Sequence, residues 1–342
     1  MSSRKSRNAV PFILVNGSLV EGVESVRNAV FNHFRAQFRP SPNLRPSMAA
    51  LNFRTLPPID GACLVRPFIV EEIKGAVWEI DSYKCPGPDG FTFGFFKDFW
   101  DILKDDVLRF MVECHRNGRL SKGINSTFIA FIPKVDNPHR LNDFRPISLV
   151  GSMYKILAKV LANRLRSVIG LVISDSQSAF IKGRQILDGI LVANEIVDAA
   201  RKYKKELVLF KVDFEKAYDM VDWGYLDEVM SKMGFPTLWR KWIKECVGTA
   251  TASVLVNGSP TDEFPLGRGL RQGDPLSPFL FLLAAEGFNV LMESLNQNNL
   301  FSGFQLGINA SITVSHLQFA DDTLILGDKS WANIREIGRA HV

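Results

Sequence analysis

Three aspartates stand where apolar segments of the chain end, and carboxylates placed in this way could hold divalent cations. Asp321 and Asp322 lie between two short apolar stretches, a pattern that predicts two strands joined by a tight acidic turn. Asp213 directly follows the apolar run 207–212, which predicts a strand buried on both faces. If the three carboxylates converge, they repel one another, and bound cations relieve that repulsion. An isolated Asp-Asp pair is more often a solvated turn, so the rest of the chain must decide between a solvated turn and a cation site.

The composition is that of a folded protein with material for one or two domains. The chain has 342 residues, 46% of them hydrophobic and 23% charged, with a net charge of +5. This mild basicity suits a polyanionic partner without requiring one. The four cysteines form no Cys-x-x-Cys pair, so a zinc site is not expected. The basic N-terminus lacks the apolar core of a secretory signal, and the longest apolar run, 279–285, is far shorter than the ~20 residues of a membrane span. We therefore expect an intracellular chain with no membrane partner.

The elements that must position the aspartates follow from hydrophobic periodicity and turn residues. Asn257-Gly258 predicts a hairpin between strands at 252–256 and 263–266. The resulting order of strand, helices, hairpin, helix and strand-turn-strand favours an α+β fold with an antiparallel sheet over a regular βαβ series. No Gly-x-Gly-x-x-Gly follows a strand, which excludes a dinucleotide-binding fold. Helices are expected at 18–38, from 70, and at 95–114, 149–169, 186–203 and 278–295, and strands at 126–133 and 207–213.

Three segments taken together carry the strongest signal. They are 211–219, 269–278 and 319–322, each of which alone could be a strand end, a helix start or a turn. In this order and spacing they resemble the palm motifs of reverse transcriptases, and most closely those of non-LTR (LINE-type) retrotransposons of the plant-like kind. Further segments resemble the fingers of the same enzymes, so that the likeness runs from about residue 65 to 335: 85–90, 132–134, 144–148 and 177–180.

The resemblance implies a right-hand polymerase fold with fingers and palm, whose antiparallel palm sheet packs on helices. The implied divisions are 1–60 as an N-terminal extension or linker, 61–206 as fingers, 207–335 as palm, and 336–342 as a tail outside the family. Family members continue with a primer-gripping hairpin and a helical thumb. We therefore expect a truncated chain with the thumb missing and with little or no processive synthesis, and a tail that is an assembly artefact.

The resemblance also implies the reaction, an in-line transfer of a nucleotide from a dNTP to the 3′-hydroxyl of a DNA primer on an RNA template. Two Mg²⁺ ions about 3.5–4 Å apart, replaceable by Mn²⁺, would lower the pKa of the hydroxyl and neutralise the pyrophosphate. Asp213, Asp321 and Asp322 would be the catalytic ligands, with Asp213 and Asp321 as the firmer pair. The backbone carbonyl of Phe214 would be a further ligand.

Other residues would contact the nucleotide. Tyr218 would be the aromatic gate that leaves no room for a 2′-hydroxyl, and relatives often carry Phe at this position. The alternative is a buried tyrosine in the core of the palm, and one residue can have both roles. Gln272 and Gly273 would lie against the incoming nucleotide and the template base, with glycine permitting close approach. Lys134 and Arg145 would hold the triphosphate, or would be exposed loop charges.

The remaining charged residues have weaker assignments. Asp219 and Asp222 are explained by capping or solvation, and Lys211 by a charge at a strand edge. Four residues of the helix at 149–169 could grip nucleic-acid phosphates, although a solvated helix face is the equal alternative: Lys155, Lys159, Arg164 and Arg166.

Two other functions remain open on the same fold. One is a catalytically inactive or maturase-like RNA-binding protein, which would have no need of clustered carboxylates. The other is an RNA-only replicase, against which Tyr218 argues. The sequence does not fix the oligomeric state, the template RNA or the choice between nucleus and cytoplasm.

Overall fold

Helices and strands mix irregularly along the chain, which confirms the predicted α+β class. The computed structural model describes residues 11–15, 17–40, 45, 47–307 and 312–339. The basic residues 1–7 and most of the proline-rich stretch around 42–46 lie outside the described residues. The helices are α2 (Val23–Gln37), α3 (Pro58–Leu64), α4 (Val70–Glu79), α5 (Phe93–Asp98), α6 (Trp100–Asn117), α7 (Ser152–Val172), α8 (Ile186–Lys202), α9 (Ala217–Met220), α10 (Trp223–Lys232), α11 (Thr237–Gly248), α12 (Ser277–Gln297) and α13 (Trp331–Arg339), with a 3-10 turn at Leu141–Asp143.

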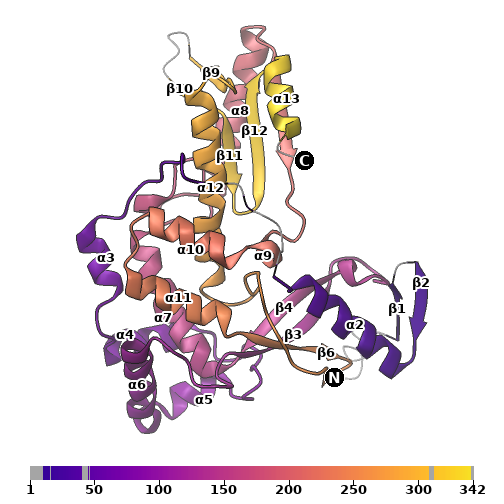
Figure 1. Cartoon of the computed structure of the whole chain (residues 1–342), viewed down its shortest axis with the longest axis vertical. Helices are drawn as coiled ribbons and strands as arrows, with labels where there is room; N and C mark the ends of the chain where they lie inside the picture. The colour runs from indigo at the N-terminus through magenta and orange to yellow at the C-terminus, as the bar shows by residue number, and fades with distance from the viewer. Residues whose placement is uncertain (1–10, 16, 41–44, 46, 308–311, 340–342) are drawn as a thin grey trace.

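A three-stranded antiparallel sheet carries the acidic turn. It has the order β11-β12-β5, and Figure 1 shows it standing above most of the helices. The predicted strand at 207–213 is not buried on both faces, because β5 is the edge strand and Leu209 is 48% exposed. The strands are β5 (Leu207–Val212), β11 (His316–Phe319) and β12 (Asp322–Asp328).

A second sheet lies apart from the three-stranded sheet. Its order is β4-β3-β6-β7, with β8 also on β6, and β3 and β6 run parallel while the other pairs are antiparallel. The predicted hairpin turn is confirmed, because Asn257 and Gly258 take φ of 53° and 85°, the left-handed values that a tight hairpin requires. The strands are β3 (Ser126–Pro133), β4 (Phe144–Val150), β6 (Thr251–Val256), β7 (Ser259–Pro260) and β8 (Phe264–Pro265), and a small separate pair is β9 (Phe304–Leu306) with β10 (Ile312–Val314).

Residues of β1 (Phe12–Val15) and α2 pack onto this second sheet. The helix expected at 18–38 begins only at Val23, because Ser18–Glu21 forms β2 and pairs with β1 (Phe12–Val15). Helix α2 buries an apolar stripe that includes Val30 and Phe34 in one cluster with residues of β3 and β6. Helical spacing of these side chains explains why this helix forms and which face it buries. The end of α2 consequently lies beside α9 and the lower end of the three-stranded sheet (Figure 1).

The main core surrounds α7 and α12. Helix α7 is buried along most of its length and packs against α3, α4 and α12. Helix α12 is long and apolar enough to cross a membrane by composition, but 61% of its most apolar window is buried inside the protein, as in the core helix of a folded domain. The helix expected at 95–114 is two helices, which meet at Phe99.

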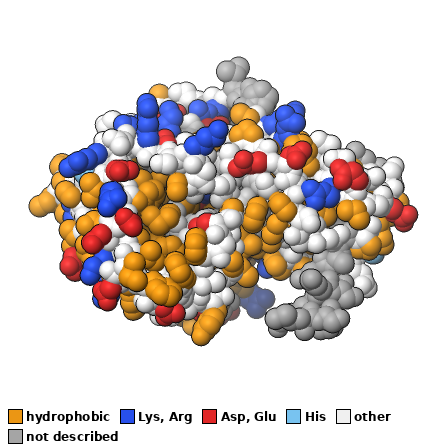
Figure 2. All heavy atoms as spheres, turned by 90° about the horizontal axis from the view of Figure 1, so that it is seen from below, with side chains coloured by type: hydrophobic (Ala, Val, Ile, Leu, Met, Phe, Trp, Pro, Cys, Tyr) orange, Lys and Arg blue, Asp and Glu red, His pale blue; other side chains and the backbone are white. Residues whose placement is uncertain are grey.

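The face seen from below carries mixed side chains. Figure 2 shows hydrophobic groups gathered over the part that lies beneath α4–α6, with Lys/Arg and Asp/Glu interspersed among them. Phe91 before α5, Phe99 between α5 and α6, and Ile102 in α6 are exposed. Because cationic and anionic side chains alternate there, this face lacks the one-signed charge that phosphate binding favours.

Candidate active site

Two of the three predicted aspartates meet at one cavity. Val212 pairs with Thr323 across β5 and β12, so Asp213 leaves its strand beside the start of β12. The turn between β11 and β12 consists of Ala320 and Asp321, and Ala320 takes a left-handed φ of 54°. Asp213 and Asp321 both line a cavity of about 700 Å³. The strand end and the hairpin tip thus line the same cavity, whereas Asp322 is not among the residues that line it.

A buried glutamine fixes the acidic turn. Gln177, which is 1% exposed, accepts hydrogen bonds through Oε1 from the backbone N–H groups of Ala320 (2.9 Å) and Ala179 (3.0 Å). Its Nε2 donates to the carbonyl of Ala320 at 3.3 Å. The neighbouring backbone extends this contact, because the N–H of Ser178 donates to the carbonyl of Gln318 at 3.0 Å. Gln177 belongs to one of the family-like segments, but the sequence alone assigned it no role.

Asp322 lies away from the cavity. Its Oδ1 accepts from Nζ of Lys211 at 3.1 Å, and both side chains are largely exposed. The hydrogen bond with Asp322 raises the pKa of Lys211. Lys211 therefore does more than mark a strand edge, since it neutralises the second aspartate of the pair. The structure brings Asp213 and Asp321 together and turns Asp322 toward a cation.

Tyr218 forms part of the cavity wall. Its ring stacks on Phe281 with centroids 4.4 Å apart, and its carbonyl accepts from the N–H of Leu270 at 2.8 Å. Burial, and then the charge of Asp321, raise the pKa of Tyr218 to about 12. The ring thus lines the cavity and also packs, partly buried, against the core, while its role as a gate stays a prediction.

The two aspartates set aside in the sequence behave differently. Asp222 is the N-cap of α10, because its Oδ1 accepts from the N–H of Tyr225 at 2.8 Å, and it also pairs with Arg45. For Asp219, capping or solvation is wrong: it is 3% exposed and lines the cavity. Burial raises the pKa of Asp219 to about 6.

Gln272 and Gly273 lie on the loop that precedes α12. The side chain of Gln272 points toward Asp219, and its backbone carbonyl accepts from the N–H of Ser148 at 2.7 Å. Gly273 takes φ of +100°, and a Cβ there would lie 3.0 Å from the carbonyl oxygen of Ser148. Glycine is therefore required by the close approach of this loop to β4.

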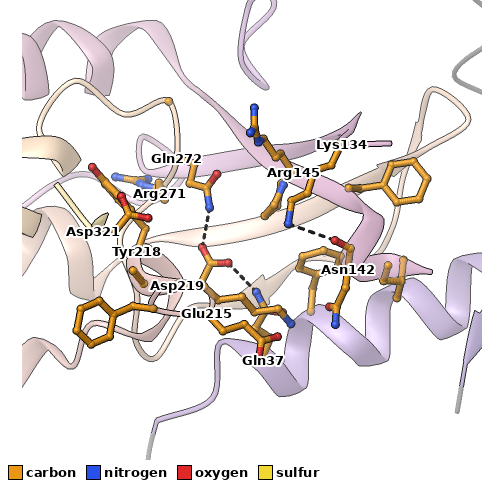
Figure 3. A pocket seen from close by; sticks show the side chains of 18 of the residues that line it. Gln37, Lys134, Asn142, Arg145, Glu215, Tyr218, Asp219, Arg271, Gln272 and Asp321 are labelled. Atoms are coloured by element: carbon orange, nitrogen blue, oxygen red, sulfur yellow. Dashed lines mark hydrogen bonds between the residues drawn. The ribbon is translucent and has the colours of Figure 1, made fainter. Parts of the chain in front are cut away.

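The predicted triphosphate ligands lie on a wall of the same cavity. Lys134 follows β3 and Arg145 belongs to β4, and both line the cavity (Figure 3). Nζ of Lys134 donates to the carbonyl of Asn142 at 3.2 Å. Phe214 also lines the cavity. Lys134 and Arg145 face Asp213 and Asp321 across a space that could hold a phosphorylated ligand.

Helix α2 supplies cavity residues that the sequence did not reveal. His33, Phe34 and Gln37 line the cavity although they come from the segment interpreted as an extension or linker. Burial, followed by the charge of Lys216, lowers the pKa of His33. No motif marks these positions, because the helical pattern shows only that one face of α2 is buried.

The basic residues of α7 do not form an exposed row. The prediction for Arg164 is wrong: its side chain is 4% exposed and pairs with Glu72 through two contacts of 2.7 Å. Lys159 pairs with Glu79 at 2.7 Å. Lys155 lies over the ring of Phe93, and its pKa is lowered by burial, while Arg166 lies over the ring of Phe279. A role in phosphate binding stays a prediction for these three.

The donor set fits a magnesium site that substrate completes. Among the residues that the structure describes, no group of three or more His, Cys, Asp or Glu side chains is assembled to hold a metal ion. Asp213 and Asp321 share the cavity, however, and Mg²⁺ commonly binds one or two carboxylates together with substrate phosphates. The two carboxylates suit such an ion, and the basic wall suits the phosphates.

Comparison with known proteins shows which family the chain belongs to. Residues 132–337 match the family described as reverse transcriptase (RNA-dependent DNA polymerase), and the chain belongs to this family. Among its relatives are the transposon TX1 uncharacterized 149 kDa protein of Xenopus laevis, 31% identical over 81% of this chain, and the Pol polyprotein of the type-1 retrotransposable element R2 of Popillia japonica, 27% identical over 77%. The predicted non-LTR retrotransposon type is thereby confirmed.

The chain spans 21% and 35% of the lengths of those two relatives. Apo telomerase from Candida tropicalis is a similar solved structure, with a TM-score of 0.44, 14% identity, and coverage of 73% of this chain and 46% of that chain.

Proposed function

We propose that this chain is the nucleotide-transferring part of an RNA-directed DNA polymerase, which extends a DNA primer on an RNA template with dNTPs. The observation that carries this proposal is the meeting of Asp213 and Asp321 at one cavity that Lys134 and Arg145 also line. Carboxylates and cations on one cavity match the needs of phosphoryl transfer, in which positioning and charge stabilisation supply most of the catalysis.

Each group has a defined task in this proposal. Asp213 and Asp321 would hold two Mg²⁺ or Mn²⁺ ions, and such ions would supply activation of the primer hydroxyl and charge neutralisation of the pyrophosphate. Arg145 and Lys134 orient the triphosphate through charge-assisted hydrogen bonds. The ring of Tyr218, held against Phe281, excludes a ribose 2′-hydroxyl.

Primer extension with matched variants tests the proposal. The 342-residue chain is given an RNA template, a DNA primer, dNTPs and Mg²⁺, and single-nucleotide incorporation is measured. Asp213→Asn and Asp321→Asn should each reduce incorporation by at least about 100-fold while RNA binding is retained. Asp328→Asn, at the far end of β12, is the control and should leave the rate unchanged. Equal rates in all four proteins would refute the assignment.

A second candidate is an RNA-binding protein that does not catalyse. The ion pair between Asp322 and Lys211 favours it, because that pair neutralises one carboxylate of the predicted ligand set. RNA binding by the wild-type chain without incorporation in either Mg²⁺ or Mn²⁺ would support this candidate over the polymerase.

A further inference from the structure

Asp219 connects two parts of the cavity wall that are distant in sequence. Its Oδ2 accepts from Nε2 of Gln37 at 2.9 Å, and its Oδ1 accepts from Nε2 of Gln272 at 3.4 Å. Nζ of Lys216 donates to Oε1 of Gln37 at 3.0 Å. Figure 3 shows the carboxylate between the two glutamines, one from α2 below and one from the loop above.

The surrounding backbone fixes this arrangement. The N–H of Gly267 donates to the carbonyl of Phe38, and Nε of Arg268 donates to the carbonyl of Gln37, both at 2.8 Å. A Cβ at Gly269 would lie 2.6 Å from the carbonyl oxygen of Asp219, so this loop packs directly against the aspartate. The end of α2, Asp219 and the loop before α12 are therefore one packed unit.

The chemistry of a carboxylate decides which way Gln272 faces. An ionised carboxylate only accepts hydrogen bonds, and with a pKa of about 6 Asp219 is ionised at pH 8. Gln272 must present its NH₂ end to Asp219, which directs its carbonyl oxygen away from Asp219 (Figure 3). A neutral asparagine at position 219 could donate as well as accept, and would not impose this orientation.

The burial of the Asp219 carboxylate also needs a physical explanation. An ionised side chain that is 3% exposed costs free energy unless it is well paired. The hydrogen-bonding partners described for its side chain are the amides of two neutral glutamines, and the charges of Lys216 and Lys134 favour its ionised form from nearby. A packing role alone would be met at lower cost by an uncharged residue, whereas orienting an amide beside a ligand cavity requires an acceptor.

We propose that Asp219 is a positioning residue for nucleotide selection, which holds the amide of Gln272 in one orientation at the nucleotide and is itself anchored on α2 through Gln37. This inference rests on the proposed polymerase function. In it, His33, Phe34 and Gln37 of α2 complete the nucleotide cavity, and Asp219 acts through Gln272 without contacting the reacting atoms.

Nucleotide affinity and kinetics test the inference together. The dissociation constant of a complementary dNTP is measured by calorimetry on the 342-residue chain bound to a dideoxy-terminated primer on an RNA template. KM, kcat and misinsertion are measured with an extendable primer. In Asp219→Asn, we expect the dissociation constant and KM to rise about tenfold, the loss that one charge-assisted hydrogen bond predicts, with kcat changed less than threefold and misinsertion increased. Gln37→Ala should shift KM in the same direction.

Two controls separate positioning from general destabilisation. Asp222→Asn is the matched variant, because asparagine is an equally good N-cap and Asp222 is not among the cavity residues; it should leave the dissociation constant and KM unchanged. Gln272→Met should weaken dNTP binding, and adding Asp219→Asn to it should cause no further loss, because residues that act through one another are not additive.

The outcomes distinguish this inference from the polymerase proposal. Wild-type dNTP affinity in Asp219→Asn, or full additivity with Gln272→Met, overturns the positioning role while leaving the polymerase assignment intact. If the wild-type chain binds dNTP without incorporating it, the polymerase proposal fails for this chain and the affinity ratios still decide the role of Asp219. If the wild-type chain binds no dNTP, both are overturned.

Discussion

Replacing Gln177 should inactivate the candidate active site, although Gln177 is not among the residues that line its cavity. The side chain of Gln177 makes three of the described hydrogen bonds, two of them to the N–H and C=O of Ala320, the residue before Asp321. Gln177→Met keeps the approximate shape of the side chain and removes every one of these bonds. Ala320 is 7% exposed, so its backbone groups would be left with little access to water.

The magnitude follows from the backbone groups that lose their partner. A buried unsatisfied donor or acceptor costs about 1–3 kcal/mol, and partial relaxation of the turn would reduce the sum, so we expect the acidic turn to lose about 2–4 kcal/mol of local stability. Asp321 would then leave its position relative to Asp213 for much of the time. A misplacement of about 1 Å costs roughly 100-fold in rate, and we expect a loss of this size.

Single-nucleotide incorporation and urea unfolding measure the two effects separately. Ser178→Ala is the control, because it removes one hydrogen bond to the same strand, from Oγ to the carbonyl of Gln318 at 3.2 Å, without touching the turn; its rate should fall less than threefold. Gln177→Met with a normal rate and a lowered unfolding free energy would refute the inference that Gln177 positions Asp321.

Three further perturbations test other parts of the structure. Asp274→Asn should lower the unfolding free energy in urea by about 3–5 kcal/mol, because it leaves the buried guanidinium of Arg271 without its counter-ion, now at 2.9 Å; a change below 1 kcal/mol would contradict this. Tyr218→Val should raise incorporation of ribonucleotides relative to deoxynucleotides by about 10- to 100-fold, and an unchanged ratio in primer extension would remove the gate assignment. Burial raises the pKa of Glu286 from 4.5 to about 7, so the folded protein binds this proton more tightly than the unfolded chain. Its contribution to stability is full below pH 4.5 and is lost as the pH rises through 7, by about 3 kcal/mol; Glu286→Gln should flatten that decline in unfolding free energy.

The element types were largely readable from the sequence. Alternation and turn chemistry located the hairpin at Asn257-Gly258 and the strands around the acidic turn, because these signals depend on neighbouring residues only. The extent of some elements was not readable. The helix that begins at Val23 was expected from 18, since pairing of β1 with β2 decides that boundary, and the exposure of Leu209 depends on the place of β5 at the sheet edge.

The sequence by itself determined the family, and it predicted Asp213, Asp321 and Asp322 as the reacting carboxylates. The three could be chosen because a strand end and an acidic turn are local patterns, and because their order along the chain resembles that of a known enzyme family. Resemblance carries over only positions with a motif, which is why it singled out Gln272 and passed over Gln37.

Only the tertiary structure decided which charged side chains line the cavity and which are paired elsewhere. It buried Arg164 against Glu72, turned Asp322 toward Lys211, and drew Asp219 into the cavity wall. Each of these outcomes depends on a partner far away in the chain or across a strand, and a charge's solvation and neighbours are set by packing. The types of the residues were therefore given by the sequence, and their roles by the residues that folding placed beside them.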